Sequence, residues 1–264
     1  MPEGDTVYRA ARNLDQALAG QVLTGCDVRV PKYATVDLTG QRVRSVGSRG
    51  KHLLLRTDEA LVHSHLKMEG AWHLYRPGGR WQRPAFEARI VLATEPWQAV
   101  GFALGKLEVL PASAEEDVVG HLGPDQHGDD WDADEALRRL AVDPERPIGL
   151  ALLDQRNLAG IGNVYRAELC FLRGVLPTRP VAEVPDLARL VALAKRTLEA
   201  NKNRVERTLT GDVRRGRQDW VYGRAGKPCR RCGTPIQEGA LGDPVRPGQG
   251  AMDRETYWCP RCQS

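Results

Sequence analysis

Apolar residues follow two different spacings along this chain. From Val7 to Leu18 the apolar residues recur every three or four positions, which places them on one face of a helix that Gly20 ends. Short runs with a period of two follow, bounded by Gly, Pro or Asp as in strands joined by turns. These runs cover residues 22–30, 42–46, 52–56, 61–66, 71–75, 88–94 and 107–110. A β-sandwich or barrel with one N-terminal helix is therefore predicted.

After these strands the spacing of apolar residues returns to the helical period of three to four. Apolar faces and proline boundaries predict helices at 133–141, 147–155, 164–173 and 185–201. From Gly223 onward the chain is a small module that carries four cysteines. We expect an α+β multidomain protein in three parts: a β-sandwich domain over 1–123, a helical domain over 124–222 and the cysteine module over 223–264.

Length and composition limit the class of protein. With 264 residues, 41% of them hydrophobic, the chain can bury cores in two or three domains. It has no apolar run of the roughly eighteen residues that a membrane span needs, and no charged and then apolar leader segment. We therefore expect a cytoplasmic protein that is not secreted and has no membrane partner. Six cysteines in that compartment argue against a disulfide framework.

Charge is distributed unevenly, although the net charge is only +4. Residues 195–231 hold twelve Lys/Arg and four Asp/Glu, whereas residues 113–145 hold two Arg and eleven Asp/Glu. A basic segment of that density next to a cysteine module indicates a surface that binds a polyanion. The alternative is an exposed helix face with many salt bridges. The acidic stretch is interpreted as a solvated linker and the start of a helix.

Two Cys-x-x-Cys pairs give the strongest signal for a metal. Cys229 and Cys232 are separated by 26 residues from Cys259 and Cys262. Four thiolates in two such pairs suit the closed tetrahedral coordination of a structural Zn²⁺, with two disulfides or free thiols as the alternative. Because sulfur fills all four positions, the ion has no position for water or substrate. It is predicted to fold the module and to take no part in chemistry.

The chain begins Met1-Pro2-Glu3-Gly4. Removal of Met1 leaves a secondary amine at Pro2 beside the carboxylate of Glu3. An α-amino group has a reference pKa of about 7.7–8.0, against about 10.4 for lysine, so roughly a tenth of it is uncharged at pH 7 and can attack a carbonyl. Attack on an aldehyde gives an iminium, which acidifies the adjacent C–H. Proline is common in second position, so this motif alone is weak support.

Four further residues each have a chemical interpretation and a simpler one. Lys51, at the start of an apolar strand, can reach an anion near the N-terminus or can be an ordinary solvated lysine. Met68, in a predicted hairpin turn, can wedge between DNA bases or fill a core gap. Asn163 ends the glycine-rich loop 155–163 and can cap the next helix or donate to a phosphate. Arg254 suits bidentate phosphate contact, or is a surface arginine.

Taken together, these residues resemble the formamidopyrimidine-DNA glycosylase/endonuclease VIII family of base-excision repair enzymes. The resemblance covers essentially the whole chain. It rests on MPEG at the N-terminus, SRGKHLLL around Lys51, SHLKMEG around Met68, HLGPD at 121–125, LLDQRNLAGIGNVYRAEL at 152–169, VYGRAGKPCRRCG at 221–233 and RETYWCPRC at 254–262. Several of these motifs are long and correctly spaced.

The resemblance implies a fold and an activity. The fold is an N-terminal β-sandwich, a helical domain with a helix–two-turn–helix motif and a C-terminal zinc ribbon, with DNA in the cleft between the two halves. The activity is that of a bifunctional DNA glycosylase and AP lyase, which removes oxidised bases through a Schiff base and cleaves the strand by β,δ-elimination. The partners implied are damaged DNA and one structural Zn²⁺, with no small-molecule cofactor, and a monomer is expected.

Residue roles follow from the same resemblance. It implies that Pro2 is the nucleophile that attacks C1′ of the damaged nucleotide and that Glu3 is the general acid/base that helps to open the sugar. Lys51, Asn163 and Arg254 grip the phosphates around the flipped nucleotide, and Lys51 and Arg254 are counted with the catalytic residues. The target base must leave the duplex at a cost of a few kcal/mol. Met68 occupies the loop that fills the resulting gap.

The chain departs from the family pattern in three places. The run at 95–102 lacks the arginine that stacks opposite a cytosine in the guanine-lesion branch, which favours the endonuclease VIII branch and oxidised pyrimidines. Thr6 replaces a common glutamate, and the zinc ribbon is longer by about ten residues, in the segment from Gly239 to Gly250. A glycosylase for guanine lesions and a non-catalytic zinc protein that binds abasic or damaged DNA are the alternatives.

Overall fold

The computed structural model describes residues 2–242 and 254–264. The chain divides into two compact units, one ending at His121 and the other running from Leu122 to Ser264. The finer division into three domains stays a prediction.

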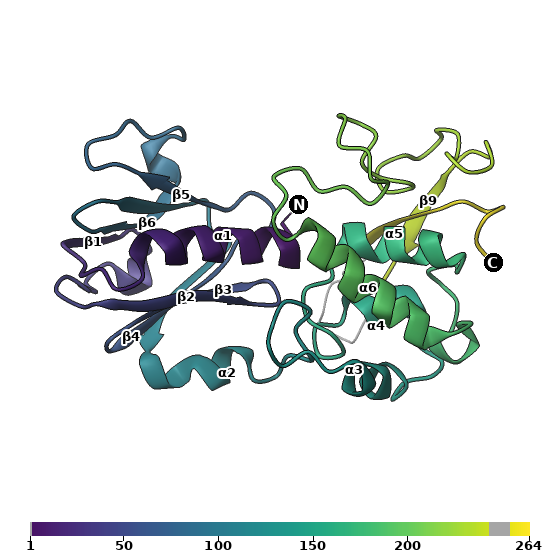
Figure 1. Ribbon diagram of the computed structural model, residues 1–264, viewed down its shortest axis with the longest axis horizontal. Helices are drawn as coiled ribbons and strands as arrows, with labels where there is room; N and C mark the ends of the chain where they lie inside the picture. Colours follow the sequence, from purple (N-terminus) through teal and green to yellow (C-terminus); the bar gives the residue numbers. More distant parts are fainter. Residues whose placement is uncertain (1, 243–253) are drawn as a thin grey trace. The chain divides into compact units, whose positions relative to one another are not determined.

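Helix α1 (Gly4–Leu18) begins the first unit, immediately after Pro2 and Glu3. Val7, Ala11 and Leu14 face inward, as the helical spacing predicts. The helix packs along strands of both sheets of this unit (Figure 1).

The strands of the first unit form two antiparallel four-stranded sheets. One sheet has the order β1-β6-β7-β5 and the other the order β2-β3-β4-β8. Their bounds are β1 Gly25–Val28, β2 Val43–Arg49, β3 His52–Thr57, β4 Ala60–His65, β5 Ala71–Tyr75, β6 Ala88–Ala93, β7 Gln98–Phe102 and β8 Lys106–Pro111. A shared core of aliphatic side chains from both sheets and α1 makes this unit a β-sandwich, as expected.

Two elements of this unit differ from the prediction. Strand β7 was missed because Glu95 and Pro96 form a turn just before it and Gly101 weakens its β-pattern. Helix α2 (Glu115–Val119) lies in the acidic stretch that was interpreted as a solvated linker and a helix start. Short 3₁₀ helices occur at Pro31–Tyr33, Ala85–Glu87 and Ala112–Ala114.

Helices dominate the first part of the second unit. Their bounds are α3 Ala133–Leu140, α4 Ile148–Leu153, α5 Asn163–Arg173 and α6 Leu187–Asn201, with a 3₁₀ turn at Val181–Glu183. They share one apolar core, and Gly174 ends α5 with φ +69°, the left-handed conformation that glycine adopts at low cost. Among the described residues, none of the helices combines the length and apolar character of a membrane span.

The C-terminal segment packs against α5. Strands β9 (Gln237–Leu241) and β10 (Arg254–Trp258) pair in antiparallel fashion, and a small core joins Tyr257 of β10 to Phe171 of α5. The chain end is fastened to the same helix. The amide of Gln263 bonds Cys259 N and Val175 O at 2.8 Å each, and Ser264 N donates to Gly174 O.

Candidate functional site

The N-terminal pair lies at the start of α1. Pro2 is half-buried and Glu3 is fully buried. The carbonyl of Glu3 accepts hydrogen bonds from the backbone N–H groups of Thr6 and Val7, both at 3.0 Å, so Glu3 is the cap residue of the helix. The positive end of the helix dipole therefore faces Pro2, which disfavours a cation there. Asp5 supplies a second buried carboxylate beside Glu3, and sequence reasoning missed it.

Lys51 occupies a two-residue turn between β2 and β3. Arg49 and His52 form the last cross-strand pair, and Gly50 has φ +57°, a conformation that favours glycine. The sequence placed Lys51 at the start of a strand, whereas it lies one residue before it. Because the turn has only two residues, the pair Arg49 and His52 sets the direction in which Lys51 leaves the sheet.

Met68 lies at the tip of a tight loop after β4. Its side chain is 64% exposed, so it does not fill a core gap. The loop is closed by a hydrogen bond from Gly70 N to Leu66 O at 2.9 Å, and a Cβ on Gly70 would come within 2.4 Å of that oxygen. Lys67 takes φ +55°. The tightness of the loop presents Met68 outward.

A chain of three ring and carboxylate groups crosses the sheet that carries Lys51. His52 Nδ1 lies 2.8 Å from His63 Nε2, and His63 Nδ1 lies 2.9 Å from the carboxylate of Glu108. Lys106 forms a 3.0 Å ion pair with the same carboxylate. Sequence analysis did not identify this chain, because it depends on the register of β3, β4 and β8.

Burial keeps these histidines uncharged. It is the largest cause that lowers the pKa of His52, to about 3, with the neighbouring histidines adding to the effect. Burial also lowers the pKa of His63, and that of His65 to about 4, where the charges of Lys67 and Lys51 contribute. Burial alone would raise the pKa of Glu108, but hydrogen bonds from His63 and Lys106 lower it.

In the second unit, Asn163 and Arg254 are linked through the residue next to Arg254. Asn163 Nδ2 donates to the carbonyl of Glu255 at 2.9 Å, and the buried Arg166 Nη2 donates to the same oxygen at 2.6 Å. Arg254 is exposed at the first position of β10. The expectation that Asn163 caps α5 is wrong, since Gly162 is the cap residue and Asn163 is the first residue of the helix.

The glycine-rich loop before α5 is organised by Gln155. Its amide donates to the carbonyls of Leu153 at 2.7 Å and Ile161 at 2.9 Å, and its oxygen accepts from Gly160 N at 3.1 Å. Gly160 has φ +108°. The loop is therefore ordered by hydrogen bonds to its backbone, and it fixes the start of α5.

Glu168 of α5 fastens the segment that leads to the cysteines. Its fully buried carboxylate accepts three backbone hydrogen bonds, from Trp220, Val221 and Tyr222, each at 2.8 Å. Burial raises the pKa of Glu168 to about 7, and the three backbone donors lower it in part. Sequence reasoning missed this residue, because a glutamate inside a helix carries no signal for burial.

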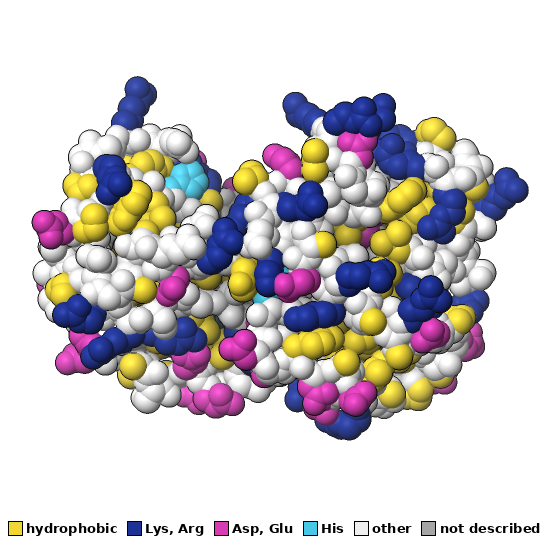
Figure 2. Space-filling view, in the orientation of Figure 1, with side chains coloured by type: hydrophobic (Ala, Val, Ile, Leu, Met, Phe, Trp, Pro, Cys, Tyr) yellow, Lys and Arg dark blue, Asp and Glu magenta, His cyan; other side chains and the backbone are white. Residues whose placement is uncertain are grey.

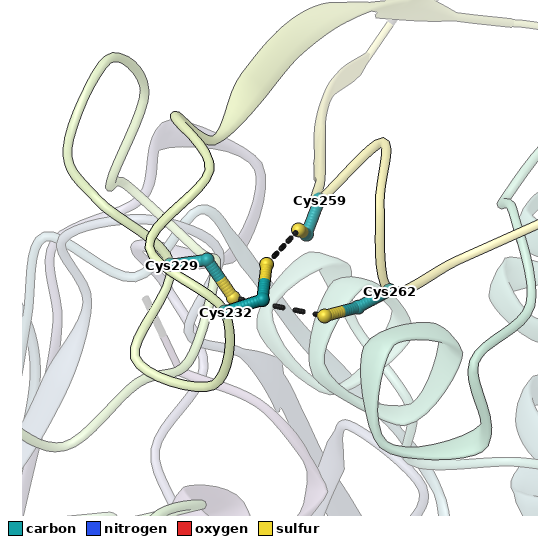
Figure 3. Close-up of side chains that lie close together, drawn as sticks. All are labelled: Cys229, Cys232, Cys259 and Cys262. Carbon is teal, nitrogen blue, oxygen red and sulfur yellow. Dashed lines mark hydrogen bonds between the residues drawn. The ribbon is translucent and has the colours of Figure 1, made fainter.

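The four cysteines come together as expected. Their sulfur atoms point toward one another (Figure 3), and all lie within 4.8 Å of each other. Two cysteines come from the loop before β9 and two from the segment after β10. Four convergent sulfurs fit a tetrahedral thiophilic ion such as Zn²⁺. The insertion between the pairs is described only at Gly239–Gly242; the remainder, including Gly250, lies outside the described residues.

The basic segment supports a positive surface on the second unit. Figure 2 shows many Lys and Arg side chains on the visible face of this unit, with fewer Asp and Glu. Some arginines are used locally, such as Arg214 on Asp212 at 2.6 Å and Arg230 on the carbonyl of Gly216 at 2.7 Å. Residues 195–231 hold twelve cations and four anions, so the segment carries a net positive charge.

The chain is similar to a group of DNA repair proteins over its full length. Residues 1–123 match the family model of the formamidopyrimidine-DNA glycosylase N-terminal domain, and residues 122–212 match that of the formamidopyrimidine-DNA glycosylase H2TH domain. The probable endonuclease 8 of Streptomyces coelicolor is 55% identical, covering 100% of this chain and 94% of that protein. The DNA-(apurinic or apyrimidinic site) lyase of Mycolicibacterium smegmatis is 53% identical, covering 100% and 99%.

A solved structure supports the fold. MutM in complex with DNA that contains carbocyclic 8-oxo-G matches with a TM-score of 0.80 over 100% of both chains, at 22% identity. This likeness confirms the predicted α+β architecture, with its β-sandwich, helical part and four-cysteine C-terminal module.

Proposed function

Because the chain belongs to the formamidopyrimidine-DNA glycosylase/endonuclease VIII family, we propose that it removes oxidised bases from damaged DNA and then cleaves the strand. It is a bifunctional DNA glycosylase and AP lyase of base-excision repair. The observation that carries the chemistry is the pairing of Pro2 with the buried Glu3 at the positive end of α1. Damaged DNA is the partner, and the protein acts as a monomer in the cytoplasm, at the nucleoid.

Pro2 is the nucleophile once Met1 has been removed. Its lone pair attacks C1′ of the damaged nucleotide, the glycosidic bond breaks, and the base leaves with a proton. Loss of the ring oxygen's bond to C1′ then gives an iminium. This cation draws electrons from the C2′–H bond, so the C2′ proton leaves and the 3′ phosphate is expelled. A second elimination expels the 5′ phosphate.

Glu3 handles the proton in these steps. It follows Pro2 in the chain and is fully buried, and a carboxyl group held next to the reacting amine can transfer protons. As general acid it protonates the ring oxygen while the sugar opens. Thr6 has a hydroxyl, hydrogen-bonded to Asp5 at 3.2 Å, where many members of the family carry a glutamate, so Glu3 acts without a carboxylate at that position.

Lys51, Asn163 and Arg254 bind phosphates on either side of the flipped nucleotide. A primary amide has two N–H groups, and Asn163 uses one of them on Glu255, which leaves the other to donate to a phosphate oxygen. Arg254 is exposed at the start of its strand and offers a planar fork to a second phosphate. Met68 enters the gap that the flipped base leaves, which its exposed position at the loop tip supports.

One structural Zn²⁺ is held by Cys229, Cys232, Cys259 and Cys262. When bound, it closes the loop before β9 onto the chain after β10 and so fixes the strand pair that carries Arg254. All steps of the reaction belong to the protein side chains. The division into domains at 1–123, 124–222 and 223–264 gives this ribbon a separate C-terminal unit.

Oxidised pyrimidines are the proposed substrates. Residues 95–102 contain no arginine to stack opposite a cytosine. Instead, Trp97 is covered by the guanidinium of Arg76, 4.0 Å from the ring centre, and the following residues form β7. The absence of an arginine from this segment is what supports the pyrimidine preference.

Borohydride trapping on an abasic duplex tests the proposal. Reduction of the iminium should give a covalent protein–DNA adduct in preparations whose mass shows that Met1 is absent. Pro2→Gly keeps a terminal amine and should lower the adduct yield, whereas retention of Met1 should abolish it. If the native protein forms no adduct but binds the duplex, the non-catalytic DNA-binding function is the correct one.

A further inference from the structure

We infer that Glu108, His63 and His52 form a hydrogen-bonded chain that positions Lys51 for its phosphate contact. These three are positioning residues, and the inference rests on the proposed role of Lys51 in binding DNA. All four residues belong to the first unit, in or beside the sheet β2-β3-β4-β8.

The chain lies on one face of that sheet. His63 is directly opposite Glu108 across β4 and β8, and His52 is opposite His65 across β3 and β4. The intervening residues, Leu53 and Leu55, point into the sandwich core on the other face. One bond joins the carboxylate of Glu108 on the edge strand β8 to the ring of His63 on β4. A second bond joins that ring to the ring of His52, the first residue of β3.

The direction of the hydrogen bonds follows from the carboxylate. Ionised Glu108 can only accept, so His63 Nδ1 carries the proton and donates to it. Neutral His63 then has its lone pair on Nε2, and His52 must donate to it from Nδ1. Lys106 Nζ forms an ion pair with the same oxygen, Glu108 Oε2, at 3.0 Å. Each contact in the chain fixes the tautomer of the next ring.

The end of the chain is the residue that closes the turn of Lys51. Gly50 and Lys51 alone connect Arg49 to His52, so the position of His52 sets the direction in which Lys51 leaves the sheet. A half-buried ring tied to a fully buried one is held more firmly than a solvated side chain. Displacement of a binding group by about 1 Å is enough to lose much of its contribution.

The charge around His52 agrees with this role. His63, His65, His121 and Lys106 all face its ring, and Lys51 lies close enough to affect His65. A charged imidazole at this point would repel Lys51 and the other lysines. An uncharged, hydrogen-bonded ring holds the turn without competing for the phosphate.

A matched pair of substitutions at His52 separates position from direct action. His52→Asn places an amide N–H where Nδ1 was, so it keeps the bond to His63 and removes Nε2. His52→Gln places its amide where Nε2 was and loses the bond to His63. His73→Asn, on β5 in the other sheet, serves as the control for loss of a histidine. Thermal unfolding of each variant checks that it is folded.

The main measurement is the Kd for a duplex that contains a tetrahydrofuran abasic analogue, taken at several salt concentrations. We expect His52→Gln to weaken binding about fivefold more than His52→Asn, and to reduce the salt slope by about 0.9, the value for one phosphate contact. In a Lys51→Ala background the two variants should bind alike, since no lysine remains to be positioned. His63→Leu should follow His52→Gln.

Three results would overturn the inference. Equal affinities for His52→Asn and His52→Gln at the wild-type level would make the chain purely structural. A defect in His52→Asn as large as that in His52→Gln would mean that Nε2 itself acts on DNA. A full effect in the Lys51→Ala background would remove Lys51 from the explanation. Failure of the proposed lyase shows differently, as the absence of a borohydride adduct from wild-type protein, and leaves the Kd series readable.

Discussion

The side-chain amide of Asn163 donates to the backbone carbonyl of Glu255, 2.9 Å away and 92 residues later in the chain. This bond joins the first turn of α5 to β10, one residue beyond Arg254. Two proposed phosphate ligands from distant parts of the sequence are thereby held in one local structure.

Arg166 donates to the same carbonyl, and its replacement should weaken both folding and DNA binding. Arg166→Met keeps a long buried side chain but removes the donor at 2.6 Å, so we expect a loss of about 1–3 kcal/mol in the free energy of unfolding. DNA affinity should fall as well, because β10, which carries Arg254, loses a hydrogen bond that holds it against α5. Unfolding in denaturant and Kd for abasic duplex measure the two effects. Unchanged affinity in a destabilised variant would contradict the link to Arg254.

Glu168 should make stability depend on pH. Its pKa in the folded protein is about 7, above the ordinary 4.5, so the folded state binds the proton more tightly than the unfolded state. The stabilisation is complete below about pH 4.5 and is lost as the pH rises through 7. Relative to Glu168→Gln, the wild type should lose about 1–3 kcal/mol between pH 5 and pH 8. Parallel stability curves for the two proteins would be the contrary result.

Removal of the metal should unfold the ribbon before the sandwich. Cys229→Ser takes away one of the four convergent sulfurs, and with it the closed coordination that holds the strand pair. We expect loss of bound zinc and of abasic-DNA binding, while the first unit keeps its own unfolding transition. Cys26→Ser, a thiol outside the cluster, is the control. Wild-type affinity in a zinc-free Cys229→Ser preparation would show that the ribbon is not needed for binding.

Met68→Ala should affect activity and leave stability unchanged. Because the side chain is 64% exposed, its truncation should alter the free energy of unfolding by less than about 0.5 kcal/mol. If it fills the gap beside a flipped base, base removal from duplex should slow more than cleavage of a preformed abasic site, where no base has to be extruded. Equal effects on both substrates would argue against a wedge.

A lesion panel tests the branch of the family. Duplexes with oxidised thymine or 8-oxoguanine should be nicked at different rates, the pyrimidine faster, because residues 95–102 provide no arginine to stack opposite a cytosine. A faster reaction on 8-oxoguanine would assign the chain to the guanine-lesion alternative.

Local patterns predicted most of the fold, and they failed where tertiary context decides. Strand β5 (Ala71–Tyr75) was predicted with its observed ends, because alternation and turn residues agree there. Strand β7 was missed because Gly101 weakens the β-pattern of the sequence. In the structure a glycine is required there, since Leu104, Ile90 and Trp72 fill the space that a Cβ would need. The helices of the second unit begin and end within about two residues of the predicted positions, because prolines limit helices through local geometry.

The candidate site divides in the same way. The cysteine cluster could be predicted from spacing, since four sulfurs in two pairs have few other arrangements. The roles of Glu108, Arg166 and Glu168 could not, because each depends on a partner at least 45 residues away. Polar residues of this kind look like surface positions in a sequence, and only the packed structure shows what they hold.

The attachment of the ribbon to α5 has a thermodynamic consequence. Glu168 holds the chain before the first cysteine pair, and Gln263 holds the chain after the last one. The entropy of arranging Asn163 and Arg254 relative to each other is therefore lost when the polypeptide folds. Association with a nucleic acid does not have to lose it again, so less of the interaction energy is consumed in ordering.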